Sequence, residues 1–204
     1  MTPAFLLVPV ILLLMKGKWD KYIFNPMITL SCMAIAAFSG AHARIYVCIA
    51  YLFSVIGDFF LCHKKIHKDS YLFGIAGFFM AHLGYLIYAL SNAAIGEASV
   101  AVASVLVIVY GAYFFIRLYP ALDSVHMRIA VSMYMLISIA VFSCAFSMNL
   151  PIVNQIFFIL GIFMILFSDT IISFSDFLGM RKWDKLIMPT YFLCHIFVCA
   201  SLVL

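Results

Sequence analysis

The segment Phe53–Leu61, which reads FSVIGDFFL, is an apolar run with one carboxylate inside it. Far along the chain, the segment Met164–Ile172 reads MILFSDTII and has the same arrangement. In each segment an aspartate, Asp58 or Asp169, follows a small residue inside a long apolar run. An ionisable side chain within a membrane helix is energetically costly and indicates a functional site. The two aspartates are therefore the first candidates for a site, and the fold must hold them inside a membrane.

The composition indicates an integral membrane protein. Of the 204 residues, 67% are hydrophobic and only 10% are charged, and the mean hydropathy is +1.19. Because a soluble domain has about 25% charged residues, this chain has too few polar side chains to cover a surface exposed to water. Its main partner is therefore predicted to be membrane lipid. The six cysteines lack CxxC spacing and lie in or beside apolar runs, which predicts small buried side chains and no disulfide framework or Cys-based zinc site.

Eight apolar runs divide the chain, and most approach the roughly 20 residues that a helix needs to cross a bilayer. We therefore predict an all-α fold, in which residues 1–204 form a single domain, a bundle of eight transmembrane helices. The runs are Pro3–Met15, Tyr22–Ser39, Ile45–Cys62, Tyr71–Leu90, Ser99–Ile116, Met127–Met148, Ile152–Ser173 and Leu186–Leu204.

The basic residues predict how the bundle is oriented. Of the 12 Lys and Arg residues, all but Arg44 lie in the odd-numbered loops between the runs. Because positively charged loops stay on the cytoplasmic side, we predict cytoplasmic odd-numbered loops and both termini outside, in a plasma (inner) membrane. The net charge of +4 is small, and the charges form short clusters between apolar runs. This pattern favours cytoplasmic loops over nucleic-acid binding.

The fourth run carries a helical face of small residues at positions 74, 77, 81 and 84. Such a face allows a neighbouring backbone to approach closely, and we expect that neighbour to be the third run. The order of the candidate residues also repeats. Asp58 precedes His82 by 24 residues on the third and fourth runs, and Asp169 precedes His195 by 26 residues on the seventh and eighth. This order suggests two four-helix halves with the same orientation.

The two aspartates are expected at similar depth below the cytoplasmic edge of the membrane. Asp58 lies six residues before Lys64, about 9 Å at 1.5 Å per residue, and Asp169 lies seven residues before Asp176, about 10 Å. Two helices can then hold the carboxyl groups face to face. A close pair of carboxyl groups shares a proton, which supplies an acid and a base from one residue type. Alternatively, Asp58 and Asp169 are separate, each paired with loop lysines or with a hydroxyl four residues away, from Ser54 or Ser173.

Other polar side chains fall near this depth. His82 and His195 are candidates for proton relays or metal ligands, although a helix–helix hydrogen bond is the simpler interpretation of each. Tyr191 lies one turn before His195 on the same helical face. Asn25 and Thr29, near the start of the second run, add polar groups at the predicted depth of the aspartates.

Several short motifs resemble the YhhN/lysoplasmalogenase family in their order along nearly the whole chain. They are the pairs Gly57–Asp58 and Ser168–Asp169, the stretch Ala81–Tyr85 and the segment Tyr191–His195. The chain departs from the family pattern at two positions. It has Asn25–Pro26 where the family has Lys-Pro, and a histidine at position 195 where the family has Gln.

The resemblance implies hydrolysis of the vinyl ether bond of lysoplasmalogens, with release of a fatty aldehyde and a glycerophospho-ethanolamine or -choline. It implies that Asp58 and Asp169 are the catalytic pair, and the acid–base chemistry requires no metal or other cofactor. A lysophospholipid substrate in the cytoplasmic leaflet would place its phosphate near loop residues and its ether bond near the aspartates. The residues expected to bind substrate are Asn25, Thr29, Ser54, His82, Tyr85, Ser173, Tyr191, His195, Lys64, Lys65, Arg181 and Lys182.

Two alternative functions remain open. The first is a metal-dependent lipid hydrolase with Asp58, His82, Asp169 and His195 as ligands, since two Asp and two His form a plausible metal site. The second is a non-enzymatic transporter or lipid-handling protein in which the aspartates couple transport to protons.

Overall fold

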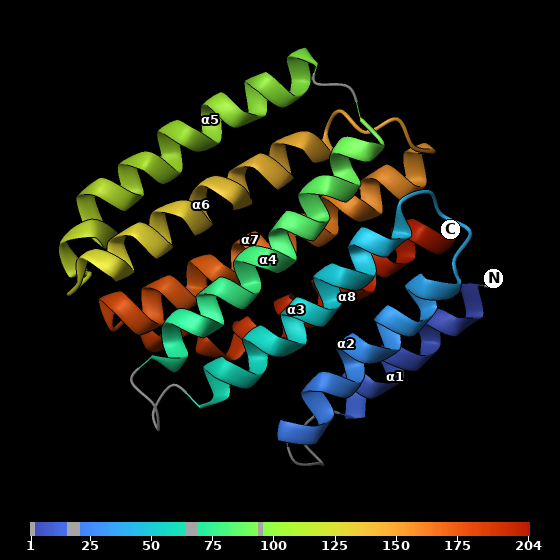
Figure 1. The fold of residues 1–204 in the computed structure, drawn as a ribbon, viewed down its shortest axis with the longest axis horizontal. Helices are drawn as coiled ribbons and strands as arrows, with labels where there is room; N and C mark the ends of the chain where they lie inside the picture. The colour runs from blue at the N-terminus through green and yellow to red at the C-terminus, as the bar shows by residue number, and fades with distance from the viewer. Residues whose placement is uncertain (1–2, 16–20, 64–68, 94–95) are drawn as a thin grey trace.

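A computed structural model of the chain describes residues 3–15, 21–63, 69–93 and 96–204, with only the backbone described at residues 3 and 21–25 (Figure 1). Apart from short connections and one isolated β-bridge, the described residues are helical, which confirms the all-α fold. The elements are η1 (Pro3–Leu6), α1 (Leu7–Met15), α2 (Lys21–Phe38), α3 (Arg44–Cys62), α4 (Ser70–Ser91), α5 (Glu97–Tyr113), η2 (Phe114–Leu118), η3 (Tyr119–Ala121), α6 (Val125–Ala145), α7 (Ile152–Leu178), η4 (Arg181–Trp183) and α8 (Asp184–Val203).

Among the described residues, six helical segments are long and apolar enough to cross a membrane. They begin at α3 and include every later α-helix, with α5 continuing through η2 and η3 and with η4 leading into α8. The two N-terminal helices are apolar but shorter, over Ala4–Met15 and Pro26–Phe38. A multi-pass membrane protein is therefore supported, whereas the count of eight spans and the orientation stay predictions.

The helices lie side by side and run up and down through the bundle (Figure 1). The α5–α6 and α7–α8 connections lie at one end, and the C-terminus lies at the other with the α2–α3 and α6–α7 connections. For brevity, we call the first of these the α5–α6 end. The two connections at this end are among those predicted to be cytoplasmic.

Helices α3 and α4 pack closely through glycines. A β-carbon added at Gly77 would lie 2.9 Å from the backbone of Gly57, and one added at Gly84 would lie 2.6 Å from the carbonyl oxygen of Tyr46. Backbone atoms cannot rotate away from such a contact, so only residues without a β-carbon fit. The predicted packing of the small-residue face against the third run is confirmed, and it holds Asp58, next to Gly57, at a tight helix pair.

Helix α5 lies at the edge of the bundle, where it packs against α6. Its outer face is exposed at several large apolar residues, among them Val105, Ile108 and Val109. A surface of this kind is suited to contact with lipid. The helix ends in the π-helical turn η2, a form that often marks a functional region, and η2 buries Phe114 and Leu118.

Candidate functional site

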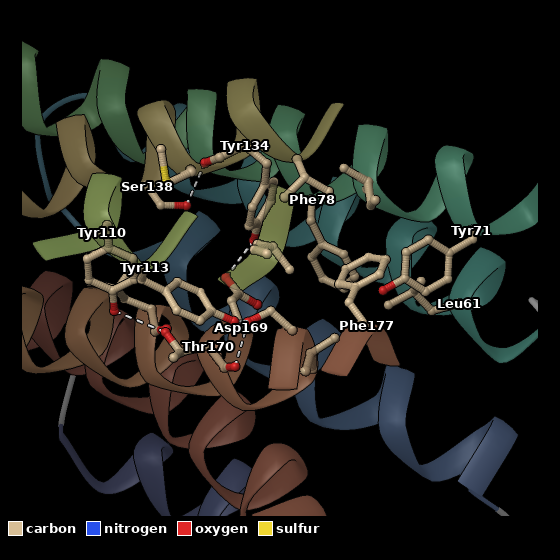
Figure 2. Close-up of a pocket in the computed structure, with 17 residues that line it drawn as sticks. Leu61, Tyr71, Phe78, Tyr110, Tyr113, Tyr134, Ser138, Asp169, Thr170 and Phe177 are labelled. Carbon is tan, nitrogen blue, oxygen red and sulfur yellow. Dashed lines mark hydrogen bonds between the residues drawn. The ribbon is translucent and has the colours of Figure 1, made fainter. Parts of the chain in front are cut away.

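A cavity lies between α4, α5, α6 and α7 in the half of the bundle nearest the α5–α6 end (Figure 2). It holds about 780 Å³ of space free of atoms, including the open space at its mouth. The lining is mainly aromatic and aliphatic, and Asp169 is the only described lining residue of a charged type.

Asp169 projects from α7 and is held by Tyr134 of α6. The Tyr134 hydroxyl donates a 2.6 Å hydrogen bond to Oδ2 of Asp169, as Figure 2 shows. The neighbouring Ser168 donates to the carbonyl oxygen of Ile187 at 3.0 Å and so ties α7 to α8. The Asp169 side chain keeps 21% of its surface exposed. The carboxyl group is therefore both oriented by a neighbouring helix and accessible from the cavity.

His82 of α4 completes this cluster, which we call the Asp169 cluster: Asp169, Tyr134 and His82. Nε2 of His82 lies 3.9 Å from Oδ2 of Asp169. Nδ1 lies 2.9 Å from the carbonyl oxygen of Phe78 and 3.3 Å from the Tyr134 hydroxyl. The imidazole is almost fully buried, so three helices bring a carboxyl group, a phenol and an imidazole together beside the cavity.

Two hydroxyl pairs connect α5 to α7 along the cavity wall. The Tyr110 and Thr170 hydroxyls lie 3.0 Å apart, and those of Tyr113 and Ser173 lie 2.7 Å apart. All four residues line the cavity. These pairs are the polar contacts that hold the peripheral helix α5 against the part of α7 that carries Asp169.

Asp58 belongs to a second cluster, made by α3, α4 and α8. The Tyr191 hydroxyl donates a 3.0 Å hydrogen bond to Oδ2 of Asp58. The ring of Tyr191 lies 4.6 Å from that of His195, and Nδ1 of His195 lies 3.3 Å from the Tyr85 hydroxyl. We call these four residues the Asp58 cluster. None of the four lines the cavity.

The two clusters are joined by aromatic contacts. Phe78 lines the cavity, and its ring centre lies 5.8 Å from that of Tyr191 in the Asp58 cluster. The rings of His82 and Tyr85 lie 6.4 Å apart on the same helix. Each aspartate thus accepts a hydrogen bond from its own tyrosine. The direct pairing of the two aspartates stays a prediction.

Ser54 and Ser173, two of the predicted partners of the aspartates, donate hydrogen bonds to backbone carbonyl groups. Ser54 donates to the carbonyl oxygen of Ala50, and Ser173 pairs with Tyr113 and donates to the carbonyl oxygen of Thr170. A serine in a helix can reach a carbonyl three or four residues back along its own helix, which competes with more distant partners. The helix–helix hydrogen bonds expected of the two histidines are present, since each contacts a tyrosine of another helix.

The remaining predicted residues lie outside both clusters or outside the described residues. Thr29 is buried, and its hydroxyl has no hydrogen-bond partner in the described part of the chain. Arg181 and Lys182 are exposed in η4 and are not among the cavity-lining residues. The side chain of Asn25 and the loop residues Lys64 and Lys65 lie outside the described residues.

The sequence interpretation missed the four tyrosines that line the cavity, Tyr71, Tyr110, Tyr113 and Tyr134. A signal was available, because a phenol hydroxyl inside an apolar helix needs a hydrogen-bond partner. That signal predicts a partner for each tyrosine without saying which one, since the partners of Tyr134 and Tyr110 lie 35 and 60 residues away.

The metal alternative requires four side chains that the structure divides between two clusters. Within the described residues, no three His, Cys, Asp or Glu side chains gather as a metal site would require. His82 and Asp169 lie in one cluster, and Asp58 and His195 lie in the other.

A family model described as the YhhN family matches residues 21–202, from α2 to α8. The chain belongs to the YhhN family. Both clusters lie within the matched region, and the resemblance seen in the short motifs is confirmed. Membership associates the chain with hydrolase activity. No curated protein and no solved structure matches the chain.

Proposed function

We propose that the protein is an intramembrane lysoplasmalogenase, which hydrolyses the vinyl ether bond of a single-chain lysophospholipid. The observation that carries the proposal is the position of Asp169, an acidic side chain facing a largely apolar cavity between membrane helices. An apolar pocket with a few convergent polar groups is the expected form of a site for a lipid-like ligand. Membership of the YhhN family supports the same reaction class.

The chemistry of a vinyl ether requires an acid. Protonation of its β-carbon produces an oxocarbenium ion, and water adds to the cationic carbon with loss of a proton. The resulting hemiacetal collapses to a fatty aldehyde and a glycerophospho-alcohol. One water is consumed, and the proton given to carbon is replaced by the proton that water releases. A positioned carboxyl group can supply the proton, and the carboxylate that remains can stabilise the cation.

The position of the cavity suits a lysophospholipid in the leaflet at the α5–α6 end. Asp169 lies seven residues before Asp176 on α7, about 10 Å at 1.5 Å per residue. Phe177 and Tyr71, near the ends of their helices, also line the cavity. In the proposed pose, the head group lies at the ends of these helices. Arg181 follows the end of α7 closely in the sequence. The ether bond then reaches Asp169.

In this proposal Asp169 is the acid and Asp58 is the second carboxyl group. Contacts lead from the cavity to Phe78, from Phe78 to Tyr191, and from Tyr191 to Asp58. A negative charge behind this pair of rings would favour the oxocarbenium ion without contacting it, because charges act over longer distances where water is excluded.

The test uses purified full-length protein in detergent with lysoplasmenyl-ethanolamine as substrate and release of fatty aldehyde as readout. The matched control substrate is the saturated alkyl ether with the same chain and head group, which acid cannot cleave through a β-carbon. We expect aldehyde from the vinyl ether alone. Folded protein that releases no aldehyde overturns the proposal. If chelation removes a bound metal and abolishes the activity, the result would instead favour the metal-dependent alternative.

A further inference from the structure

The Nε2 atom of His82 is a buried polar atom that the fold leaves without a hydrogen-bond partner among the described residues. It faces Oδ2 of Asp169 at 3.9 Å, an ion-pair distance. An unsatisfied buried polar group is costly and calls for an explanation. Catalytic hydrogen bonds are often long without substrate and shorten in the reacting complex.

The other ring nitrogen determines what Nε2 can do. Nδ1 of His82 contacts the carbonyl oxygen of Phe78, which can only accept a hydrogen bond. It also contacts the hydroxyl of Tyr134, whose own hydrogen is directed to Asp169. Both contacts therefore require a hydrogen on Nδ1. In a neutral imidazole with hydrogen on Nδ1, Nε2 is an acceptor.

Two acceptors then face each other if Asp169 is ionised and His82 is neutral. One additional proton removes this conflict, either as a carboxylic acid beside imidazole or as a carboxylate beside imidazolium. The titratable side chains that contact His82 are Asp169 from α7, Tyr134 from α6 and Tyr85 from its own helix. Among the described residues neither tyrosine forms a hydrogen bond with Nε2, which leaves Asp169 as the group that shares the proton.

We propose that His82 and Asp169 hold one proton between Nε2 and Oδ2, and that His82 is the positioning residue for the proton used in the reaction. The role in turnover rests on the proposed function, whereas the shared proton does not. The proton leaves Oδ2 for the β-carbon of the vinyl ether. The proton released by the attacking water returns to Asp169 and restores the shared state, so atoms and charge balance over the cycle.

The shared proton is tested without substrate by nitrogen NMR of full-length protein carrying ¹⁵N-labelled histidine. The His82 signals are identified by their loss in His82→Gln. We expect the Nε2 shift of His82 to lie between those of a protonated and an unprotonated ring nitrogen. In Asp169→Asn it should move to the unprotonated value. An Nε2 shift that is the same in the wild type and in Asp169→Asn overturns the proposal, whatever the activity proves to be.

The role in turnover is tested by chemical rescue. His82→Ala should lower kcat by about 100-fold, the lower range for lost acid–base assistance, with KM changed less than about twofold because His82 does not line the cavity. Added imidazole should restore kcat at least tenfold. Pyrrole has the same ring shape and an N–H group but no basic nitrogen, so it should restore nothing.

Rescue by pyrrole equal to that by imidazole would show that the ring merely fills space, and would overturn the role in turnover. His126→Gln replaces a histidine at an exposed position of α6 and controls for effects of substitution and purification that are unrelated to the site. It should retain wild-type kcat. If His82→Ala does not fold, His82→Gln replaces it, since the amide can donate to Asp169 but cannot take up a proton. Wild-type kcat in His82→Gln would also overturn the role.

Discussion

The two aspartates have similar sequence surroundings and different structural ones. Each follows a small residue in an apolar run, and each accepts a hydrogen bond from a tyrosine of another helix. Asp169 faces the cavity between α4, α5, α6 and α7, whereas Asp58 lies at the closely packed α3–α4 pair and does not line that cavity. A polar motif in a membrane helix therefore becomes a candidate active site only where the packing leaves space beside it.

The difference in packing has a simple origin. Helices α3 and α4 meet through Gly57, Gly77 and Gly84, so backbone contacts backbone. Helices α5 and α7 meet instead through tyrosine side chains whose hydroxyl groups pair with Thr170 and Ser173. Long side chains hold the second pair of helices apart and leave a cavity beside Asp169.

The largest expected effect separates the two carboxyl groups. Asp169→Asn should lower kcat for vinyl ether hydrolysis by about 10³–10⁴-fold, the upper range for loss of a general acid. Asp58→Asn should lower it by only about tenfold, because a charge acting through intervening rings has a smaller effect than direct proton transfer. Aldehyde release by both purified variants is the measurement. Equal losses would support a directly paired dyad, and full activity in both would remove these residues from the reaction.

Filling the cavity tests whether substrate binds there. Val131→Trp places a large ring among the cavity-lining residues, whereas Met133→Trp, two residues along α6, places it on an exposed face. We expect kcat/KM to fall by about tenfold or more for Val131→Trp, because even one methylene misplaced in an apolar pocket costs about 1–3 kcal/mol. Met133→Trp should have near wild-type kcat/KM. The same loss in both variants would indicate that the cavity is not the substrate site.

The two tyrosine hydroxyls offer a smaller contrast. Tyr134→Phe removes the 2.6 Å hydrogen bond to Asp169, and Tyr191→Phe removes the 3.0 Å bond to Asp58. A hydrogen bond to a charged group contributes about 1.5–3 kcal/mol, so we expect kcat to fall about 10- to 100-fold in Tyr134→Phe. Tyr191→Phe should lose less than about threefold, since its partner acts at a distance. A larger loss in Tyr191→Phe would reverse the assignment of the acid.

The smallest effect on the chemistry is expected from the glycines, which test the packing difference itself. Gly84→Ala would force a β-carbon to within 2.6 Å of a backbone oxygen of α3, whereas Gly111→Ala on α5 meets no atom within 4 Å. Overpacking typically costs about 1–3 kcal/mol. Alanine in place of glycine inside a helix stabilises by up to about 1 kcal/mol. Thermal unfolding in detergent should therefore show a lower Tm for Gly84→Ala and an equal or higher Tm for Gly111→Ala.

Much of the fold follows from local patterns in the chain. Each of the eight apolar runs contains a helix, because a lipid-embedded backbone must satisfy its hydrogen bonds within each segment. The glycine spacing in the fourth run correctly predicted its packing against the third. The α7 helix extends to Leu178, five residues beyond the predicted apolar run, because hydropathy marks contact with lipid and does not mark the end of a helix.

The candidate site could be predicted only in part. Both aspartates and both histidines were identified, because ionisable side chains are conspicuous in apolar runs. From the sequence, Asp58 could either pair with Asp169 or lie apart from it, and His82 was expected to be one of several substrate contacts. The structure places His82 against Asp169, and Tyr191 against Asp58.

Composition and periodicity are properties of the chain alone, so they predict the membrane class, the helical segments and the residues able to carry acid–base chemistry. Family membership followed from its motifs and is confirmed over residues 21–202. Only the tertiary structure decided which helices adjoin the cavity, and so distinguished Asp169 from Asp58. A hydrogen-bond partner or an unfilled volume depends on how helices distant in the chain pack together. Two similar Asp motifs, at Asp58 and Asp169, can therefore have different surroundings.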